Sequence, residues 1–460
     1  MRKLLLLIAL AGPAPVLAQP AARLALPAAT AAVPTELSLD QALSLARTHQ
    51  GAYQNLALDE QIAGQAARAA RGLYAPQLGA AADLRYNAIL PTNIIPNFAN
   101  PASGERLALQ FGTRYQASAG FTATQRLYDA SALAQRQVAA VNEQLAANAT
   151  RRGRVTLVQT VNAAYYEALL RETQLAFAEA DQARTQAAYQ DIMARQQAGR
   201  ALATDVSAAQ ITARTAGLAL DLARQNIGLS KQNLLAVLGL PAAPAAALRL
   251  TDPLAALLAA RADTAAWTAP TSAAQRPELE QEALNARLAT ATGQAERSGY
   301  RPTVGVVGYL GANGYDNGLV NALDPVHHWY GNSYVALQAS LPLLDGSARA
   351  TRVETQRLRQ QQAQNRRADL RQSTDYEVAN ARVQLQNAWQ TLRVRQANVA
   401  VAAQSAGLVA LRQQAGRALP REALDAEATR QQTQRDYLQA VYDFLAARLE
   451  YARTTGALAE

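Results

Sequence analysis

A seven-residue stretch, Gln-Gln-Ala-Gly-Arg-Ala-Leu, occurs twice in the chain, at residues 196–202 and 413–419. Other landmarks recur at a similar spacing, including Gly239 with Gly456 and a Tyr-x-Pro motif at residues 74–76 and 300–302. A Leu-x-Asp motif also recurs at a similar spacing, at residues 127–129 and 343–345. Because several independent landmarks agree, the sequence predicts an internal repeat and a fold made of two similar halves.

Each half is expected to contain a short helix, a strand, a loop, a second strand and a long helical hairpin. The predicted first repeat, residues 19–272, has its strand pair at about 76–124, its hairpin at about 130–238 and a Pro/Ala-rich connection at about 241–272. The predicted second repeat, residues 273–460, has its strand pair at about 302–341 and its hairpin at about 347–456.

The first arm of each hairpin is unusually long. Segments from about Ala130 to Gln197 and from about Ser347 to Gln414 are rich in Ala, Gln, Arg, Leu and Glu, which are strong helix formers. A helix of ~65 to 70 residues is ~100 Å long at 1.5 Å per residue, too long to fold inside a compact domain. Gly199 and Gly416 are expected to end these helices, because glycine readily adopts the left-handed backbone conformation found there.

The predicted strands alternate apolar and more polar residues with a period of two, at residues 77–86, 115–124, 303–311 and 335–341. This pattern suits a wall with lipid on one side and water on the other, although a soluble hairpin with one face on a core would also alternate. Aromatic residues cluster near these segments, as an interfacial girdle would: Tyr86, Phe98, Phe111, Tyr115, Tyr309, Trp329, Tyr330 and Tyr334.

The N-terminus has the layout of a secretory signal peptide over residues 1–18, with Arg2 and Lys3 before an apolar stretch and small residues near Ala18. A short N-terminal anchor or a buried helix is the alternative. No later apolar stretch is long enough for a membrane-spanning helix, so a membrane crossing would have to be a β-barrel. The chain has no cysteine, which excludes disulfides, thiol chemistry and a lipidated N-terminal cysteine.

Four strands cannot close a membrane barrel, because even small barrels use about eight. Since open strand edges are not tolerated in lipid, any barrel must be shared between copies of the chain. Two copies would supply eight strands, which their own side chains fill, whereas three would supply twelve and leave an open channel.

Little in the sequence points to catalysis or to nucleic acid. The net charge of +9 comes from arginines spread beside Glu, Asp and Gln, not from basic runs, so nucleic-acid binding is not expected. The histidines are His49, His327 and His328, of which the last two lie in a predicted loop. We find no zinc spacing and no phosphate-binding glycine motif, so no cofactor, no metal site and no enzymatic activity are predicted.

These features together resemble TolC-type outer-membrane factors, the outer membrane efflux proteins. The residues that carry the resemblance are the signal peptide, the two repeats, both Tyr-x-Pro motifs, the segment 341–346 that leads into the second long helix, and the glycine turns. The resemblance implies mixed α and β architecture: a homotrimer with a twelve-stranded β-barrel in the outer membrane of a Gram-negative-type bacterium, continuous with a long helical barrel in the periplasm.

The resemblance also implies a function and partners. Such a protein is a passive exit duct of a tripartite efflux or type I secretion system, gated at its periplasmic helix tips. It would contact outer-membrane lipid around the barrel, a periplasmic adaptor at the helix tips, and an inner-membrane pump through that adaptor.

By position relative to the tip glycines, the family's acidic constriction falls on Glu422 and Asp425, with Asp205 in the first half. Three copies would form rings of like charge, although carboxylates near a helix start also complement the helix dipole. Ala418 and Gln413 occupy the positions of the family's closing arginine and tyrosine, so Arg417 and Arg421 are the predicted closing contacts. The predicted adaptor-docking tips are Gly199, Arg200, Ala201, Leu202, Gly416, Arg417, Ala418 and Leu419.

Three other interpretations remain open from the sequence. A periplasmic adaptor is also exported and helical, but it predicts one hairpin flanked by compact β-domains. A structural coiled-coil protein of the envelope would not need alternating strands with aromatic flanks. A hydrolytic enzyme is the weakest alternative.

Overall fold

The computed structural model describes residues 34–96, 106–242, 248–261, 267, 276–326 and 329–458. The predicted signal peptide, His327, His328 and Phe98 lie outside these residues. Within them the chain forms two units. Unit 1 comprises Gln65–Val141 and Leu288–Leu358, and unit 2 comprises Ala29–Gly64, Asn142–Arg287 and Arg359–Glu460, each as far as described. The fold is mixed α and β, as predicted.

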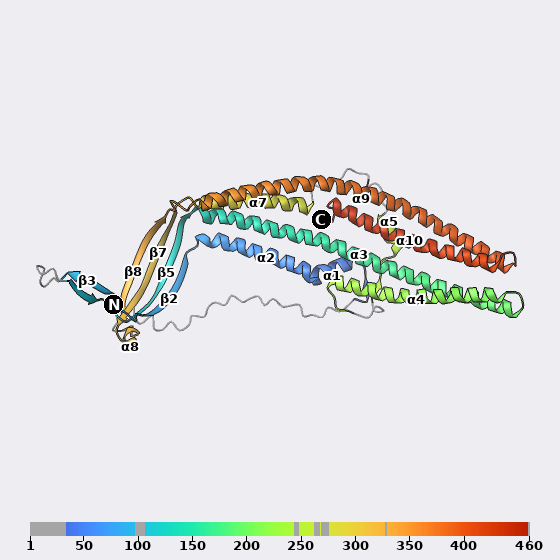
Figure 1. The fold of residues 1–460 in the computed structure, drawn as a ribbon, viewed down its shortest axis with the longest axis horizontal. Coiled ribbons are helices and arrows are strands. Elements are labelled where there is room, and N and C mark those ends of the chain that lie inside the picture. Colours follow the sequence, from blue (N-terminus) through green and yellow to red (C-terminus); the bar gives the residue numbers. More distant parts are fainter. Residues whose placement is uncertain are drawn as a thin grey trace. The chain divides into compact units, whose positions relative to one another are not determined.

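Unit 1 contains an antiparallel four-stranded sheet in the order β2-β5-β7-β8. Its strands are β2 (Gln77–Tyr86), β5 (Tyr115–Asp129), β7 (Thr303–Asp316) and β8 (Trp329–Ser340) (Figure 1). Pairing of β5 with β7 joins strands from the two predicted halves into one sheet. The segment between β2 and β5 forms a small ribbon of β3 (Thr92–Pro96) and β4 (Arg106–Gln110), and α8 (Leu319–Ala322) lies between β7 and β8.

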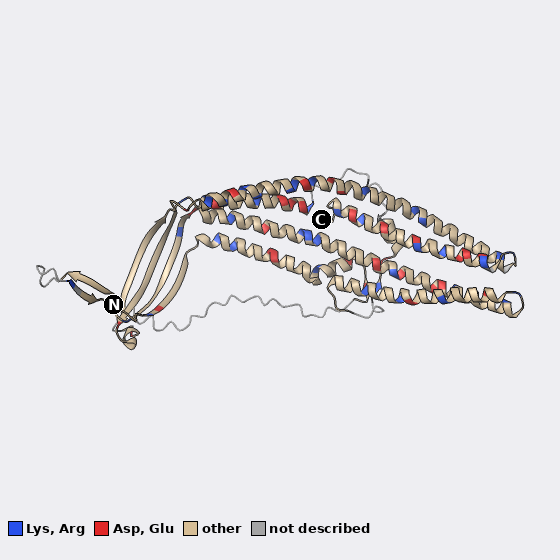
Figure 2. Cartoon of the chain, viewed as in Figure 1, with Lys and Arg blue, Asp and Glu red and all other residues tan. Residues whose placement is uncertain are grey.

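Four helices lie in unit 2: α1 (Leu39–His49), α4 (Ala203–Leu238), α5 (Leu254–Arg261) and α10 (Pro420–Thr454). Four more have residues in both units: α2 (Gly51–Arg71), α3 (Ala130–Gln197), α7 (Pro277–Ser298) and α9 (Ala348–Gln414). Helices α3 and α9, with 68 and 67 residues, have the lengths that the composition predicted. Figure 2 shows that charged residues are spread along the helices and are few on the strands.

The core of unit 2 gathers around a short parallel pair of β1 (Glu36–Leu37) and β6 (Arg249–Leu250). The Tyr165 hydroxyl, on α3, donates to the Asp252 carboxylate at 2.7 Å, and the Leu39 N–H at the start of α1 donates to the same oxygen at 2.8 Å. Apolar side chains complete the core, among them Leu37, Leu157, Val161, Leu234, Leu235, Leu238, Leu385, Leu438, Val441 and Phe444.

Both Tyr-x-Pro motifs mark helix-to-strand turns in unit 1, and an arginine braces each. The Arg136 guanidinium lies 5.1 Å from the centre of the Tyr74 ring and donates to the Arg71 carbonyl at 2.7 Å. The Arg349 guanidinium lies 5.5 Å from the centre of the Tyr300 ring and donates to the Gly299 carbonyl. In each case the arginine belongs to the long helix, so the cation–aromatic contact ties the start of that helix to the turn before the strand.

Candidate functional site: a two-faced sheet and two helix turns

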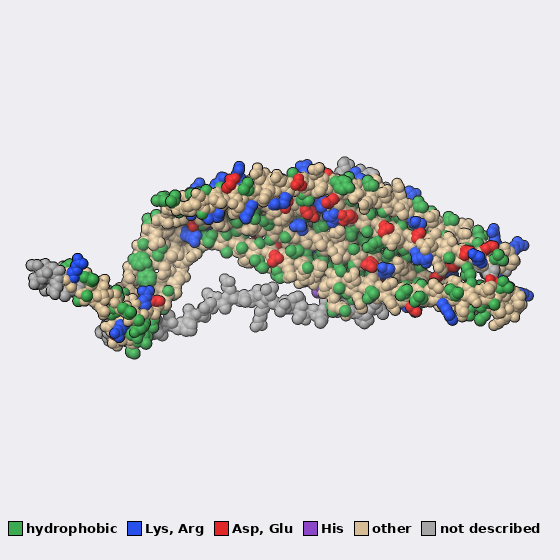
Figure 3. Space-filling view, viewed as in Figure 1, with side chains coloured by type: hydrophobic (Ala, Val, Ile, Leu, Met, Phe, Trp, Pro, Cys, Tyr) green, Lys and Arg blue, Asp and Glu red, His purple; other side chains and the backbone are tan. Residues whose placement is uncertain are grey.

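The sheet of unit 1 has one apolar and one polar face. Residues paired across neighbouring strands share a face, and the registers connect Leu78 with Ala123, and Phe121 with Leu310. The apolar face carries large side chains that are all at least half exposed: Leu78, Leu84, Phe121, Leu310, Val335 and Leu337. Apolar side chains lie over the strands in Figure 3.

The opposite face carries hydroxyl, amide and charged side chains together with tyrosines. Its polar members are Gln77, Asp83, Arg85, Gln116, Ser118, Thr122, Thr124, Asn313, Asn332 and Gln338. The tyrosines are Tyr309, Tyr315, Tyr330 and Tyr334. We call the two surfaces the apolar face and the polar face. On the outer strands β2 and β8, residues of both faces are largely exposed in the single chain, so neither face is covered there as the inner face of a hydrophobic core would be.

The two outer strands of this sheet, β2 and β8, each have one neighbour within the described residues. An unpaired strand edge presents a row of backbone N–H and C=O groups. Beside a surface as apolar as this one, such edges require a partner strand or water.

The aromatic residues divide into two sets. Tyr86, which ends β2, and Tyr115, which begins β5, are paired with ring centroids 4.9 Å apart, and Trp329 and Tyr330 begin β8, as an interfacial set would. Tyr309 and Tyr334 instead lie in the middle of β7 and β8, on the polar face. For these two the prediction of a position near the strand ends is wrong, because β7 continues to Asp316 and β8 already begins at Trp329, beyond the predicted strand bounds.

The two Gly-Arg-Ala-Leu turns of unit 2 have the same backbone geometry. Gly199 and Gly416 both have φ of 71°, and at each turn the next N–H donates to a carbonyl five residues earlier at 2.8 Å. These bonds, from Arg200 to Arg195 and from Arg417 to Arg412, satisfy carbonyls left free at the helix end. Leu202 and Leu419 follow in extended conformation and are 69% and 65% exposed.

The acidic residues after the two turns are held differently. The Asp205 carboxylate accepts the Leu202 N–H at 3.2 Å, which satisfies a free donor at the start of α4. Glu422 is exposed in the first turn of α10, and Asp425 lies 3.9 Å from Arg421 in a solvent-exposed pair. Arg417 is also exposed. The single chain therefore brings Arg421 to Asp425, and the constriction, closing and docking roles of these residues stay predictions.

A partly buried group of four charged residues lies between α3 and α10, and the sequence did not predict it. Asp181 lies 3.1 Å from Arg184 and 3.6 Å from Arg430, while Arg184 lies 3.4 Å from Glu427 and Arg430 also pairs with Glu427. Gln431 donates to Asp181 at 2.7 Å. Arg430 is 8% exposed. We call Asp181, Arg184, Glu427 and Arg430 the charged cluster; each helix offers an i,i+3 pair, but sequence alone does not join them.

Burial is the largest influence on both acids of this charged cluster. It raises the pKa of the Asp181 carboxyl, and the nearby Glu427 charge acts in the same direction. Burial also disfavours the charged form of Glu427, but hydrogen bonding and charge from Arg430, followed by Arg184, outweigh it and hold the Glu427 pKa below its usual range. Glu427 is thus the stable anion of the pair.

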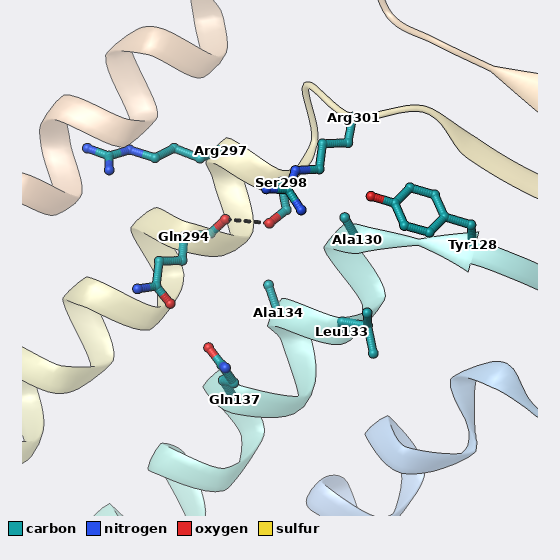
Figure 4. Close-up of a pocket in the computed structure, with 9 residues that line it drawn as sticks. All are labelled: Tyr128, Ala130, Leu133, Ala134, Gln137, Gln294, Arg297, Ser298 and Arg301. Carbon is teal, nitrogen blue, oxygen red and sulfur yellow. Dashed lines mark hydrogen bonds between the residues drawn. The ribbon is translucent and has the colours of Figure 1, made fainter.

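A recess of about 410 Å³ lies in unit 1 where β5 passes into α3 beside the end of α7. Its walls are Tyr128, Ala130, Leu133, Ala134, Gln137, Gln294, Arg297, Ser298 and Arg301. In Figure 4 Arg301 turns toward Ser298, whose hydroxyl donates to the Gln294 carbonyl at 2.8 Å, whereas Arg297 points away. A lone inward arginine and apolar walls give the recess the character of a helix–strand junction.

Among the described residues, no three His, Asp or Glu side chains gather closely enough to hold a metal ion. Within the same residues, no helix combines the length and the apolar character needed to span a membrane.

Comparison with protein families now adds an independent observation. Residues 269–457 match the family model described as outer membrane efflux protein. The predicted resemblance is confirmed. Members of this efflux family are passive channels and not enzymes, which agrees with the sequence-based expectation. No curated protein matches the chain.

Solved structures of outer-membrane channels share the fold. VceC from Vibrio cholerae has a TM-score of 0.67 and 17% identity, covering 91% of this chain and 96% of that one. MtrE from Neisseria gonorrhoeae, in its open state, has a TM-score of 0.67 and 16% identity, with coverages of 91% and 88%. CmeC from Campylobacter jejuni has a TM-score of 0.67 and 12% identity, with coverages of 91% and 85%. At these identities the likeness concerns the fold.

Proposed function

We propose that three copies of this chain form a passive efflux duct through the outer membrane of a Gram-negative-type bacterium. Their sheets close into a barrel with lipid outside and water inside, and their long helices continue the duct into the periplasm. A periplasmic adaptor and an inner-membrane pump deliver substrates to its helical end. Energy for transport comes from the pump, since the outer membrane efflux proteins that the chain resembles are passive channels.

The two-faced sheet with unpaired outer strands carries this proposal. Its apolar face suits lipid and its polar face suits a water-filled lumen. One copy supplies four strands, so three supply twelve, and pairing of β2 with β8 of the next copy would leave no open edge. A soluble periplasmic adaptor would not expose Leu78, Leu310 and Val335 on one surface.

The helices of unit 2 support association of copies independently. Helices α4 and α9 are the outermost of this unit in Figure 1. Each carries a line of apolar residues, at least half exposed, spaced by four, seven or eleven residues, as in a coiled-coil seam. The lines are Ile211, Leu218, Leu222 and Leu229 on α4, and Tyr376, Val383, Val394, Val401 and Leu408 on α9. We propose that the α4 line of one copy packs against the α9 line of the next.

The helix turns are the proposed periplasmic gate and docking surface. Three copies of Glu422 and Asp425 would form acidic rings that attract cations, with Arg417 and Arg421 close enough in sequence to compensate that charge when the duct is closed. Asp205 also stabilises the start of α4, because its carboxylate accepts a hydrogen bond from the Leu202 N–H. The exposed leucines and arginines of the two turns are proposed to meet the adaptor.

The oligomer can be tested at the helix lines. Leu218→Glu on α4 and Val401→Glu on α9 place a charge in the proposed seam, whereas Ala219→Glu, one residue and about a quarter turn away, leaves it intact. Native mass spectrometry of the detergent-purified protein should give a trimer for the unsubstituted chain and for Ala219→Glu, and mainly monomers for the other two. Monomers for the unsubstituted chain in native-like lipid would contradict the proposal.

A further inference from the structure

Tyr309, in the middle of β7, lies along the sheet instead of standing out from it. A Cβ atom placed on Gly120 would lie 2.6 Å from the Tyr309 hydroxyl oxygen and 2.8 Å from the ring carbon that carries it. A Cβ on Gly311 would collide with the same hydroxyl oxygen. The tyrosine therefore occupies the space that side chains at these two positions would fill.

Gly120 and Gly311 are directly paired across β5 and β7 and share the polar face with Tyr309. Side chains on a sheet usually stand roughly perpendicular to it. A glycine within a strand weakens it, since it offers no side chain to pack, but an aromatic ring laid over the glycine restores that contact. The two glycines thus form a notch into which the ring of Tyr309 fits.

A second ring fixes this arrangement from the other side. Tyr334 on β8 is the direct cross-strand partner of Tyr309, and the two rings stack with centroids 5.6 Å apart and planes 23° apart. Tyr334 is 51% exposed, whereas Tyr309 is partly buried. Tyr309 is thus held between the notch and Tyr334.

We propose that the notch of Gly120 and Gly311 keeps Tyr309 against the wall of the duct and so sets the width of its lumen at mid-sheet. This inference rests on the proposed function, because the polar face must face the lumen. Three copies would place three such rings around the pore. An upright ring in each copy would narrow the passage at this level, so the notch keeps the lumen wide in the middle of the sheet.

The experiment compares single-channel conductance in planar bilayers. Gly120→Ala fills the notch and forces the ring outward, so conductance should fall below that of the unsubstituted chain. Tyr309→Ala should conduct like the unsubstituted chain, because its ring lies outside the water path. The double variant should also conduct normally. Gly79→Ala is the matched control, on the polar face of β2 with open space around the added carbon.

The outcomes separate this inference from the duct itself. Unchanged conductance in Gly120→Ala overturns the notch and leaves the duct standing. If Gly120→Ala lowers the conductance and adding Tyr309→Ala does not restore it, the loss comes from the backbone of β7, where the Gly311 Cα lies 2.9 Å from the added carbon. This result also overturns the notch. If Tyr309→Ala alone raises the conductance, the ring already stands in the water path of the unsubstituted chain, and the notch proposal is overturned. If neither the unsubstituted chain nor Gly79→Ala conducts, the result contradicts the proposed duct itself.

Discussion

The sheet of unit 1 and the unit 2 part of helices α3 and α10 differ in which side chains they expose to solvent and which they bury. In the sheet, large apolar residues such as Leu310 and Val335 are exposed, and the polar residues share the other face. Between α3 and α10, the buried Arg430 pairs with the half-buried Asp181 and Glu427. The helices are thus held together within one chain, whereas the sheet depends on what surrounds it.

The largest expected effect is in the charged cluster. Arg430→Met leaves the half-buried Asp181 and Glu427 near each other without this partner. Breaking a fully buried pair in this way typically costs about 3–5 kcal/mol, so a loss of up to that size is expected. Urea unfolding in detergent, followed by helical circular dichroism, measures the loss. Arg421→Met is the control, because its exposed pair should contribute less than about 1 kcal/mol. Equal effects would erase the contrast between buried and exposed pairs.

The sheet should respond according to face. Leu337→Arg places a charge on the apolar face, toward the end of β8, and should cost about 1–3 kcal/mol of membrane stability, less than a charge at the midplane. Gln338→Arg, one residue along β8 and on the polar face, should be tolerated. Folding into lipid vesicles, read as the fraction protected from protease, measures both. A larger loss for Gln338→Arg would reverse the assignment of the two faces.

Acid should weaken the helical region through Glu427. Because its folded-state pKa is held below the usual value of 4.5, its contribution is present above that value and is lost as the pH falls through the folded pKa. Asp181 acts oppositely, since its raised pKa favours folding below its usual value and opposes it as the pH rises. The free energy of unfolding, measured from pH 7 to pH 3, should fall less steeply toward acid in Glu427→Gln than in the unsubstituted chain. The same pH dependence in both proteins would contradict the role assigned to Glu427.

The smallest effect separates the two helix turns. Asp205→Ala removes the acceptor for the Leu202 N–H and should cost about 0.5–1 kcal/mol, whereas Glu422→Ala, at the matching position of the second turn, should cost less than about 0.5 kcal/mol. The same unfolding measurement resolves the difference. A larger cost for Glu422→Ala would show that Glu422 caps its helix, which would favour a structural role over the proposed constriction.

Local patterns predicted much of the fold. Period-two alternation placed β2, β5, β7 and β8 because successive side chains of a strand point to opposite faces of the sheet, and composition gave the lengths of α3 and α9. Glycine chemistry located both turns, where the φ of 71° favours that residue.

Register between distant segments could not be predicted. Asp181 and Arg430 meet only because α3 and α10 pack at one particular offset, which the repetitive Ala/Gln/Arg pattern does not specify. The mid-strand position of Tyr309 and its fit to Gly120 depend in the same way on the pairing of β5 with β7. The sequence shows an acidic residue in the first turn of both α4 and α10. It does not show that Asp205 accepts a backbone hydrogen bond whereas Glu422 is exposed, because that difference lies in side-chain geometry.

Single-channel recording of the purified protein in planar bilayers tests the central claim most directly, namely that copies of this chain close into an aqueous duct. The account predicts discrete, cation-selective openings that change when Glu422→Ala and Asp425→Ala are combined and divalent cations are varied. Openings indifferent to that double substitution would retain the duct and remove the acidic rings. Failure of the intact protein to insert and conduct under any condition would contradict the account.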